Sequence, residues 1–64
     1  MHYKVEYHMV NGKMFGRRLE GENINQIKDL IYSEDGEYII CTDENYQWVR
    51  IVSSQIVAIE IREL

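Results

Sequence analysis

Hydrophobic and polar residues alternate along the first part of the chain, and this alternation predicts two β-strands. In residues 3–9 every second residue is apolar, and the residues between them are charged or polar. The apolar set of this segment is Tyr3, Val5, Tyr7 and Met9. Residues 14–20 form the second predicted strand, with Phe15 and Leu19 two pleats apart on one face. Asn11-Gly12 lies between the two segments and is a strong hairpin signal.

The register of this hairpin follows from the faces of its two strands. A two-residue turn on Asn11-Gly12 would place Val5 opposite Arg18, which puts the apolar residues of the two strands on different faces. A loop of three residues with Gly12 in the left-handed conformation brings these faces together, so we expect that loop. The other face then carries charged residues that can pair across the strands: Lys4, Glu6, Arg18 and Glu20.

A short amphipathic helix is predicted after the hairpin. Asn23 is a good N-cap residue, and Gln26 three positions later is placed to close a capping box. Apolar residues then recur at helical spacing: Ile24, Ile27, Leu30 and Ile31. We expect the helix to end near residue 33 or 34, because Asp35-Gly36 supplies a turn.

Three further strands are predicted at residues 37–42, 46–52 and 56–62, separated by polar turns at 43–45 and 53–55. The order is ββαβββ, and the short connections favour antiparallel neighbours. We therefore predict a single α+β domain over residues 1–64, in which one helix accompanies a five-stranded antiparallel curled sheet or a small barrel.

The third and fourth predicted strands are apolar on both faces. One face carries Ile39, Cys41, Val49 and Ile51. The other carries Tyr38, Ile40, Tyr46 and Trp48. A single short helix cannot cover both faces of five strands, so either the sheet curls into a barrel or its second face meets a partner or a second copy.

The C-terminal stretch 49–61, VRIVSSQIVAIEI, resembles the last hairpin of Sm-like and SH3-like small barrels. In those families an apolar strand, a tight polar turn and a further apolar strand close the barrel. The whole pattern of a hairpin, a short helix and a closing IVAIEI-type strand is also similar to small uncharacterised proteins of Gram-positive bacteria and their phages. That resemblance implies a cytoplasmic accessory or phage-encoded protein that acts by binding.

Composition narrows the function classes. The chain has 64 residues with seven Lys and Arg against eleven Asp and Glu, a formal net charge of −4. A protein that holds nucleic acid through phosphates is usually net basic, so the charge disfavours that class. The apolar runs are too short for a membrane span, and residues 1–6 lack the apolar core of a signal peptide. With one cysteine, this pattern predicts a cytoplasmic protein.

Candidate catalytic and metal-binding chemistry is sparse. His2 and His8 lie roughly 20 Å apart along a strand at about 3.3 Å per residue, so they do not chelate one metal. Cys41 lies in an apolar strand, where burial raises its pKa and hides it. The four glycines are dispersed and form no phosphate-binding loop. We therefore expect no metal, no cofactor and no enzymatic activity.

Basic and aromatic residues supply the remaining candidates. Arg17 falls on the apolar face beside Tyr7, where its charge must stack on an aromatic ring, reach the edge, or meet a partner's carboxylate. In another copy of the chain, that carboxylate can come from an acidic group in the middle of the sequence, which can equally mimic phosphates toward a host protein: Glu34, Asp35, Glu37, Asp43 and Glu44. The alternative without a functional role is that these acidic residues form a solvated turn region, which is the commoner case.

The first hypothesis for function is a non-enzymatic protein-binding module that forms a homodimer. It further describes the chain as a phage or prophage accessory protein that modulates a host factor. Its interface candidates are Tyr7, Arg17, Tyr46, Trp48 and Arg50. The alternative is a nucleic-acid-binding small barrel, in which basic and aromatic residues contact single strands: Lys13, Arg17, Arg18 and Trp48. A small-ligand or nucleotide sensor is a further alternative.

Overall fold

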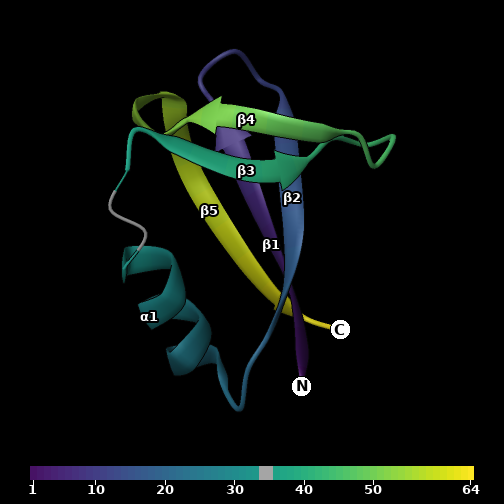
Figure 1. The fold of residues 1–64 in the computed structure, drawn as a ribbon, viewed down its shortest axis with the longest axis vertical. Helices are drawn as coiled ribbons and strands as arrows, with labels where there is room; N and C mark the ends of the chain where they lie inside the picture. The colour runs from purple at the N-terminus through teal and green to yellow at the C-terminus, as the bar shows by residue number, and fades with distance from the viewer. Residues whose placement is uncertain (34–35) are drawn as a thin grey trace.

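The computed structural model describes residues 1–33 and 36–64, in which one α-helix, one short 3-10 helix and five strands occur, with the α-helix and strands in the predicted order ββαβββ (Figure 1). The elements are β1 (His2–Met9), β2 (Met14–Glu20), α1 (Ile24–Ser33), β3 (Tyr38–Thr42), β4 (Trp48–Val52), the 3-10 helix η1 (Ser53–Gln55) and β5 (Ile56–Glu63). All strand pairs are antiparallel within one curled sheet, so the predicted α+β class is confirmed.

The first hairpin has the predicted register and loop. Tyr3 lies opposite Leu19 and Tyr7 opposite Phe15, which places the apolar residues of both strands on one face. The Met9 N–H donates to the Lys13 carbonyl at 2.8 Å, so the loop consists of the three residues between them. Gly12 adopts φ +86°, the left-handed conformation that this loop requires.

Helix α1 begins at the predicted cap. The Gln26 N–H donates to the Asn23 side-chain oxygen at 3.0 Å, which satisfies one of the free donors of the first turn. The predicted capping box is displaced by one residue, because the Gln26 side chain accepts from the N–H of Glu22 at 2.6 Å instead of from Asn23.

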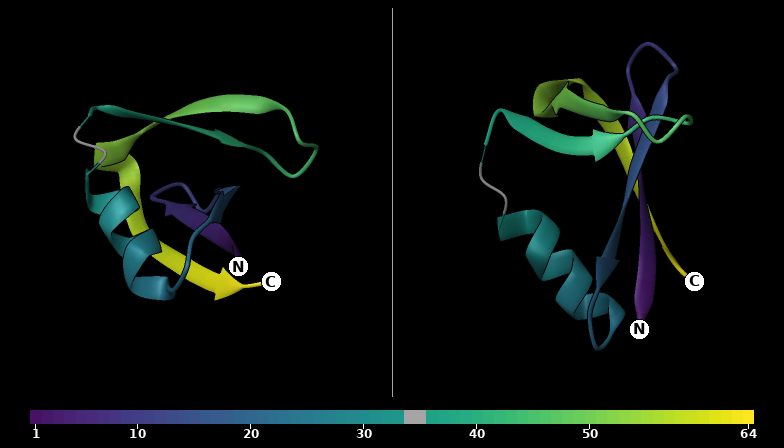
Figure 2. Two further views of the ribbon diagram at one scale, coloured as in Figure 1. Left: turned by 60° about the horizontal axis from the view of Figure 1, so that its bottom comes forward. Right: turned by 45° about the vertical axis from the view of Figure 1, so that its right-hand side comes forward.

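Strand β5 pairs with β1, and the sheet order is β4-β3-β2-β1-β5. The preference for sequential neighbours is therefore wrong for the last two strands, which lie at opposite ends of the sheet order. The physical reason is η1: one short 3-10 turn carries the chain away from β4, and Val10 then donates to the Gln55 carbonyl at 2.9 Å beside the first hairpin. Figure 2 shows the result, with the β3–β4 hairpin arching over the β1–β5 pair.

The two parts of the sheet meet at a single residue pair, Gly16 of β2 and Thr42 of β3. The Thr42 hydroxyl reinforces this junction by donating to the Gly16 carbonyl at 3.0 Å. Gly16 leaves little room for a side chain, since a Cβ there would lie 3.0 Å from Lys4 Cε and 3.1 Å from the Val5 carbonyl oxygen. The absence of a side chain at this position therefore allows the sheet to curl closely around its own first strand.

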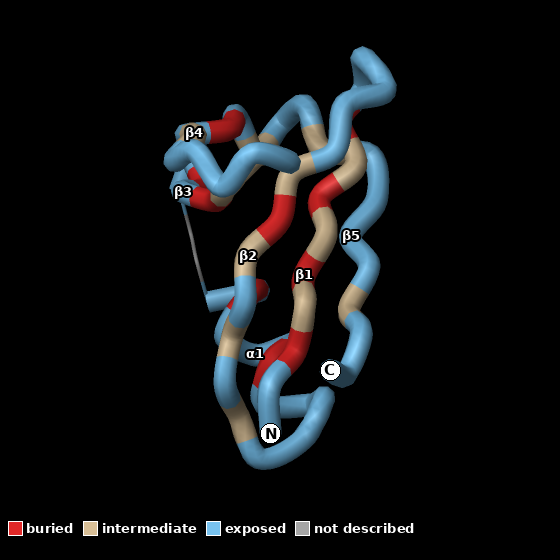
Figure 3. Tube along the Cα trace, turned by 90° about the vertical axis from the view of Figure 1, so that its right-hand side faces the viewer, coloured by how far each residue is buried: buried red, intermediate tan, exposed pale blue. Residues whose placement is uncertain are grey.

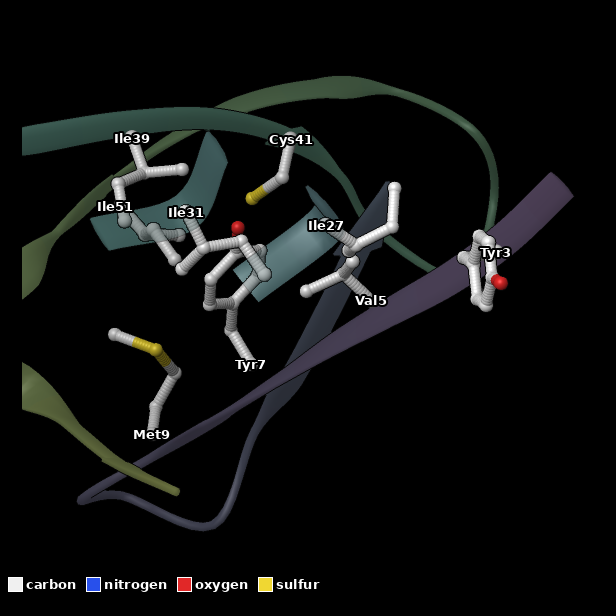
Figure 4. Packing of buried hydrophobic residues seen from close by; sticks show 9 residues of the cluster. All are labelled: Tyr3, Val5, Tyr7, Met9, Ile27, Ile31, Ile39, Cys41 and Ile51. Carbon is white, nitrogen blue, oxygen red and sulfur yellow. The ribbon is translucent and has the colours of Figure 1, made fainter. Parts of the chain in front are cut away.

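The core fills the concave side of the curled sheet, and its members alternate along β1 as the sequence predicts (Figure 3). The nine buried residues are Tyr3, Val5, Tyr7, Met9, Ile27, Ile31, Ile39, Cys41 and Ile51. Two of them, Ile27 and Ile31, come from α1 and pack near Val5 and Tyr7 (Figure 4). Removal of this apolar surface from water contributes about 25 cal/mol per Å² to stability, which is the main favourable term in a chain this small.

The convex side of β1 is charged, and two of its side chains contact side chains of β5. Glu6 lies 3.4 Å from Arg62, and His8 lies 2.9 Å from Glu60. Across the first hairpin Lys4 lies directly opposite Arg18 and Glu6 opposite Gly16, so the predicted pairs of these charges can form only on the diagonal. In residues 1–33 and 36–64, no helix is both long enough and apolar enough to cross a membrane.

Candidate binding surface

The convex side of the β3–β4 hairpin carries a row of large apolar side chains. In the register of this pair Tyr38 lies opposite Val52, Ile40 opposite Arg50 and Thr42 opposite Trp48. Residues opposite each other in an antiparallel pair share a face, so these six side chains form one surface. We call five of them the aromatic face: Tyr38, Ile40, Trp48, Arg50 and Val52.

The aromatic face is open to solvent. The exposed fractions are 78% for Trp48, 60% for Ile40, 51% for Tyr38 and 40% for Val52. The residues between them in sequence face the core, as Cys41 and Ile51 show with 0% and 4% exposure. Both apolar faces predicted for these strands are therefore present, one in the core and one uncovered. Contiguous exposed apolar patches on a small domain usually mark an interaction surface.

Arg50 supplies a positive charge within this surface. Its guanidinium carbon lies 4.5 Å from the centroid of the Tyr38 ring, in cation–π contact. The stack holds a long, flexible side chain against the sheet while its N–H groups keep their capacity to donate. Arg50 is the only charged residue among the six that face outward from β3 and β4. The surface thus combines aromatic rings with one positioned cation.

Tyr46 borders the aromatic face and adopts an unusual backbone conformation. The predicted fourth strand began at residue 46, but β4 begins at Trp48 and Tyr46 belongs to the loop. The cause is Asp43, whose side-chain oxygen accepts from the N–H groups of Asn45 at 2.8 Å and Gln47 at 2.9 Å. These bonds shape a three-residue loop like that of the first hairpin, and Tyr46 takes its left-handed position with φ +59°. In the first hairpin Gly12 fills that position.

A tyrosine at positive φ costs conformational energy, of order 1–2 kcal/mol. Tyr46 is 77% exposed, so packing in the monomer does not explain why the position holds an aromatic residue. Residues held in such conformations are concentrated at functional sites. The conformation therefore adds Tyr46 to the candidate binding surface on grounds independent of the aromatic face.

Replacement of Tyr46 by glycine is expected to stabilise the isolated protein. Tyr46→Gly relieves the positive φ and removes few contacts, so the free energy of unfolding should rise by about 1 kcal/mol. Urea unfolding followed by circular dichroism measures the change, and Asn45→Gly is the matched control because Asn45 does not have positive φ. A Tyr46→Gly variant less stable than the wild type would show that the position is not strained.

Tyr7 and Arg17, the other two interface candidates, lie away from the aromatic face. Tyr7 is 0% exposed, because β1 is flanked by β2 and β5 and its concave side is covered by the core. Arg17 is half-buried with its guanidinium carbon 5.8 Å from the Tyr7 ring centroid, so it stacks on an aromatic ring, the first of the three predicted outcomes. These two residues belong to the interior and its rim in the folded chain.

Burial also decides the ionisation of two core groups. It raises the pKa of the Tyr7 hydroxyl above its ordinary value, an effect that the nearby Arg17 charge opposes. Burial likewise raises the pKa of the Cys41 thiol. Figure 4 shows the Cys41 sulfur pointing toward the Tyr7 hydroxyl inside the core. A buried, protonated thiol is a poor nucleophile and a poor metal ligand, so this cysteine acts as an apolar core residue.

The four residues of the nucleic-acid hypothesis are distributed over different surfaces. Arg17 and Arg18 are consecutive in β2 and therefore point to opposite sides of the sheet. Lys13 lies at the end of the first hairpin loop, and Trp48 lies on the aromatic face. The folded chain does not bring the four side chains onto one surface.

A shallow cleft of about 500 Å³ lies where the β3–β4 loop approaches the convex side of β1 and β2. Its lining includes residues of both charges: the cations are Lys4 and Lys13, and the acids are Glu6, Asp43 and Glu44. A small-ligand hypothesis would place its site here. The mixed lining favours neither an anion nor a cation.

The predicted acidic group is only partly described. Glu34 and Asp35 lie outside the described residues. Asp43 shapes its loop through the two backbone bonds given above, and Glu37 and Glu44 are exposed. Within residues 1–33 and 36–64, no three His, Cys, Asp or Glu side chains are grouped as metal ligands.

Comparisons of the sequence and the structure add no relative: no family model, curated protein or solved structure matches this chain. The candidate surface therefore depends on the geometry of this chain alone. Three of its members, Tyr38, Ile40 and Val52, are absent from the predicted interface set. The alternation in residues 37–42 already placed Tyr38 and Ile40 with Trp48, so this signal was present in the sequence.

Proposed function

We propose that this chain is a non-enzymatic protein-binding module whose aromatic face contacts the partner. The observation that carries the proposal is the exposure of Trp48, Tyr38 and Ile40, at 78%, 51% and 60%, on one side of a single hairpin. Tryptophan, tyrosine and arginine are the residues that most often dominate the binding energy of protein interfaces. The strained Tyr46 beside this face supports the same assignment.

A protein partner suits this surface better than nucleic acid does. Nucleic-acid binding depends on several cations that neutralise phosphates, and the aromatic face contains only Arg50. The net charge of −4 would also repel a polyanion. A small accessory protein that adjusts a host factor is the first form of the proposal, and the small size of the chain favours it. Self-association through the same face is its second form.

Trp48→Ala is expected to abolish partner binding without unfolding the protein. Truncation of a central aromatic anchor typically costs about 2 kcal/mol or more of binding energy, which is roughly thirtyfold in affinity. Stability should change by less than about 0.5 kcal/mol, since an exposed side chain makes few contacts. Tyr32→Ala is the matched control, because Tyr32 of α1 is 79% exposed and lies on a different element.

The test has two steps. Immobilised wild type, Trp48→Ala and Tyr32→Ala first capture proteins from a cell extract, and proteins lost only with Trp48→Ala are purified. Each is then titrated against the wild type while the emission of Trp48, the only tryptophan of the chain, is followed. A blue shift on binding supports the proposal, because it reports burial of this side chain.

Two other results would contradict a role for this face in binding another protein. Equal capture by the wild type and Trp48→Ala would exclude the aromatic face as the contact surface. A salt-dependent shift of the Trp48 emission with single-stranded oligonucleotides would favour the nucleic-acid hypothesis instead.

Sedimentation of the wild type and Trp48→Ala identifies self-association, which appears as a dimer that only the wild type forms.

A further inference from the structure

Among the residues that the structure describes, strand β4 pairs with β3 alone, so its other backbone edge is free. The register of the pairing with β3 identifies which residues present this edge. The Asp43 N–H donates to Gln47 at 3.0 Å and the Ser53 N–H donates to Glu37 at 2.8 Å, at the two ends of the pair. Hydrogen-bonded pairs alternate in an antiparallel ladder, so the odd-numbered residues of β4 bond to β3. The N–H and C=O groups of the even-numbered residues point away from β3: Trp48, Arg50 and Val52.

This edge lies at one end of the sheet order, where the next strand would add (Figure 1). The same three residues contribute their side chains to the aromatic face. An added strand would therefore form main-chain hydrogen bonds with Trp48, Arg50 and Val52 and would place every second side chain against theirs. This is the arrangement of β-strand addition, in which backbone bonds give affinity and alternate side chains give specificity.

We propose that the partner supplies an extended segment that adds as a strand to the free edge of β4, with an acidic residue opposite Arg50 and apolar residues opposite Trp48 and Val52. The inference rests on the proposed function and specifies how the partner is recognised. The recognised segment has the pattern apolar-x-acidic-x-apolar. This pattern reads the same in both directions, so parallel and antiparallel addition satisfy it equally.

Charge complementarity with Arg50 determines the central residue of the added segment. Arg50 is held on Tyr38 at 4.5 Å, within the apolar surroundings of the aromatic face. Opposite charges across neighbouring strands are favourable, and like charges are unfavourable. The net charge of −4 would repel a segment rich in acids. We therefore expect one carboxylate flanked by apolar residues.

A second copy of the chain does not supply this segment. In the whole sequence only Asp29 has apolar residues two positions away on both sides, and these are Ile27 and Ile31 of helix α1. Both isoleucines are buried in the core, at 0% and 8% exposure. Antiparallel pairing of β4 with its own copy, centred on Arg50, would also place two arginines opposite each other. These points favour a different protein as the occupant.

The other free edge of the sheet, at β5, is a poorer candidate. Its convex side chains are already engaged, because Glu60 pairs with His8 at 2.9 Å and Arg62 pairs with Glu6 at 3.4 Å. Strand β4 has no comparable ion pair in residues 1–33 and 36–64, and its one cation contacts a ring of its own hairpin. The side chains that remain available to contact an added strand are therefore those of β4.

The experiment is a titration of Trp48 emission with two short synthetic peptides. One contains Val-Thr-Glu-Thr-Val, and the other has Lys in place of Glu. The wild type is expected to bind the Glu peptide at least about tenfold more tightly than the Lys peptide. Arg50→Glu should reverse this preference, because the charges that oppose each other are exchanged.

The role of the backbone edge is tested with Val52→Pro, with Val52→Thr as the control. Val52 has φ −86°, close to the value that proline requires, and its N–H points away from β3. Val52→Pro should bind the Glu peptide at least about tenfold more weakly than Val52→Thr, which keeps the backbone N–H and a β-branched side chain. N-methylation of the peptide tests the same edge from the other strand and does not require a variant to fold. N-methylation of the central Glu removes the bond to Arg50 in antiparallel addition, and N-methylation of the Thr that follows it removes that bond in parallel addition.

Three outcomes would overturn the inference: no binding of the Glu peptide up to about 1 mM, an unchanged preference in Arg50→Glu, or undiminished binding after N-methylation and in a folded Val52→Pro. If such a result accompanies a protein partner that is lost with Trp48→Ala, the proposed function stands and strand addition at β4 fails. If Trp48→Ala captures the same proteins as the wild type, the proposed function itself fails.

Discussion

Ile27→Ala is expected to leave the protein largely unfolded at 25 °C. Ile27 is 0% exposed and projects from α1 into the core beside Val5 (Figure 4). Truncation of a buried isoleucine to alanine costs about 2–5 kcal/mol, because apolar contacts are lost and a cavity remains. A core of this size rarely provides more than about 3–5 kcal/mol of net stability, so the loss is comparable with the whole.

Circular dichroism at increasing urea concentrations measures this effect, with Ile24→Ala as the matched control. Ile24 lies in the same helix but is 42% exposed, so its truncation should cost less than about 1 kcal/mol. Ile27→Val removes a single methylene and should cost about 0.5–1.5 kcal/mol, which remains measurable if Ile27→Ala is fully unfolded. A cooperative transition of Ile27→Ala close to that of the wild type would show that α1 does not stabilise the sheet.

The faces of the elements were predictable because they depend on local patterns. Alternation along residues 3–9 and helical spacing after Asn23 both reflect which side of an element avoids water, and the structure agrees with them. The register of the first hairpin was predictable for the same reason. Shifting it by one residue would have moved Phe15 and Leu19 away from the core.

The pairing of distant strands was not predictable in this way. Apolar residues occur on both faces of β5, so alternation does not distinguish pairing with β1 from pairing with β4. The choice depends on η1 and on the bond between Val10 and Gln55, which join segments far apart in sequence. The single junction between Gly16 and Thr42 is likewise a long-range contact that no local pattern indicates.

The candidate surface was predictable in its chemistry and only partly in its geometry. Trp48 and Arg50 were identified as anchors from residue type and alternation. The left-handed conformation of Tyr46 escaped prediction, because a tyrosine has no intrinsic preference for it and Asp43 imposes it through two hydrogen bonds. The same sequence signals gave Tyr7 a binding role, although β1 is a central strand and buries it.

One hairpin serves both the core and the candidate surface. Cys41 and Ile51 of β3 and β4 contribute to the core, and Tyr38, Ile40 and Trp48 remain outside it. A chain of 64 residues has too few elements to cover both sides. The position of this hairpin relative to the rest of the sheet therefore decides where the aromatic face is presented, and that position depends on the junction with β2.

Gly16→Val is expected to weaken this junction and to lower the free energy of unfolding by about 1–3 kcal/mol, the usual cost of overpacking. The new Cβ would lie 3.1 Å from the Val5 carbonyl oxygen, a backbone atom of β1, which is held between β2 and β5. The variant must either move β1 or shift β2 away from it. Either movement strains the bond from the Thr42 hydroxyl to the Gly16 carbonyl, now 3.0 Å long.

Arg18→Val provides the control, because Arg18 lies two residues further along β2 on the same side of the sheet and is exposed. Valine is favourable in strands, so this variant should unfold within about 0.5 kcal/mol of the wild type. Urea unfolding gives both values, and amide hydrogen exchange shows whether protection is lost first in β3 and β4. If Gly16→Val matches Arg18→Val in both measurements, the close approach at Gly16 does not hold the hairpin, and the aromatic face must be positioned by the core contacts of Ile39 and Ile51 alone.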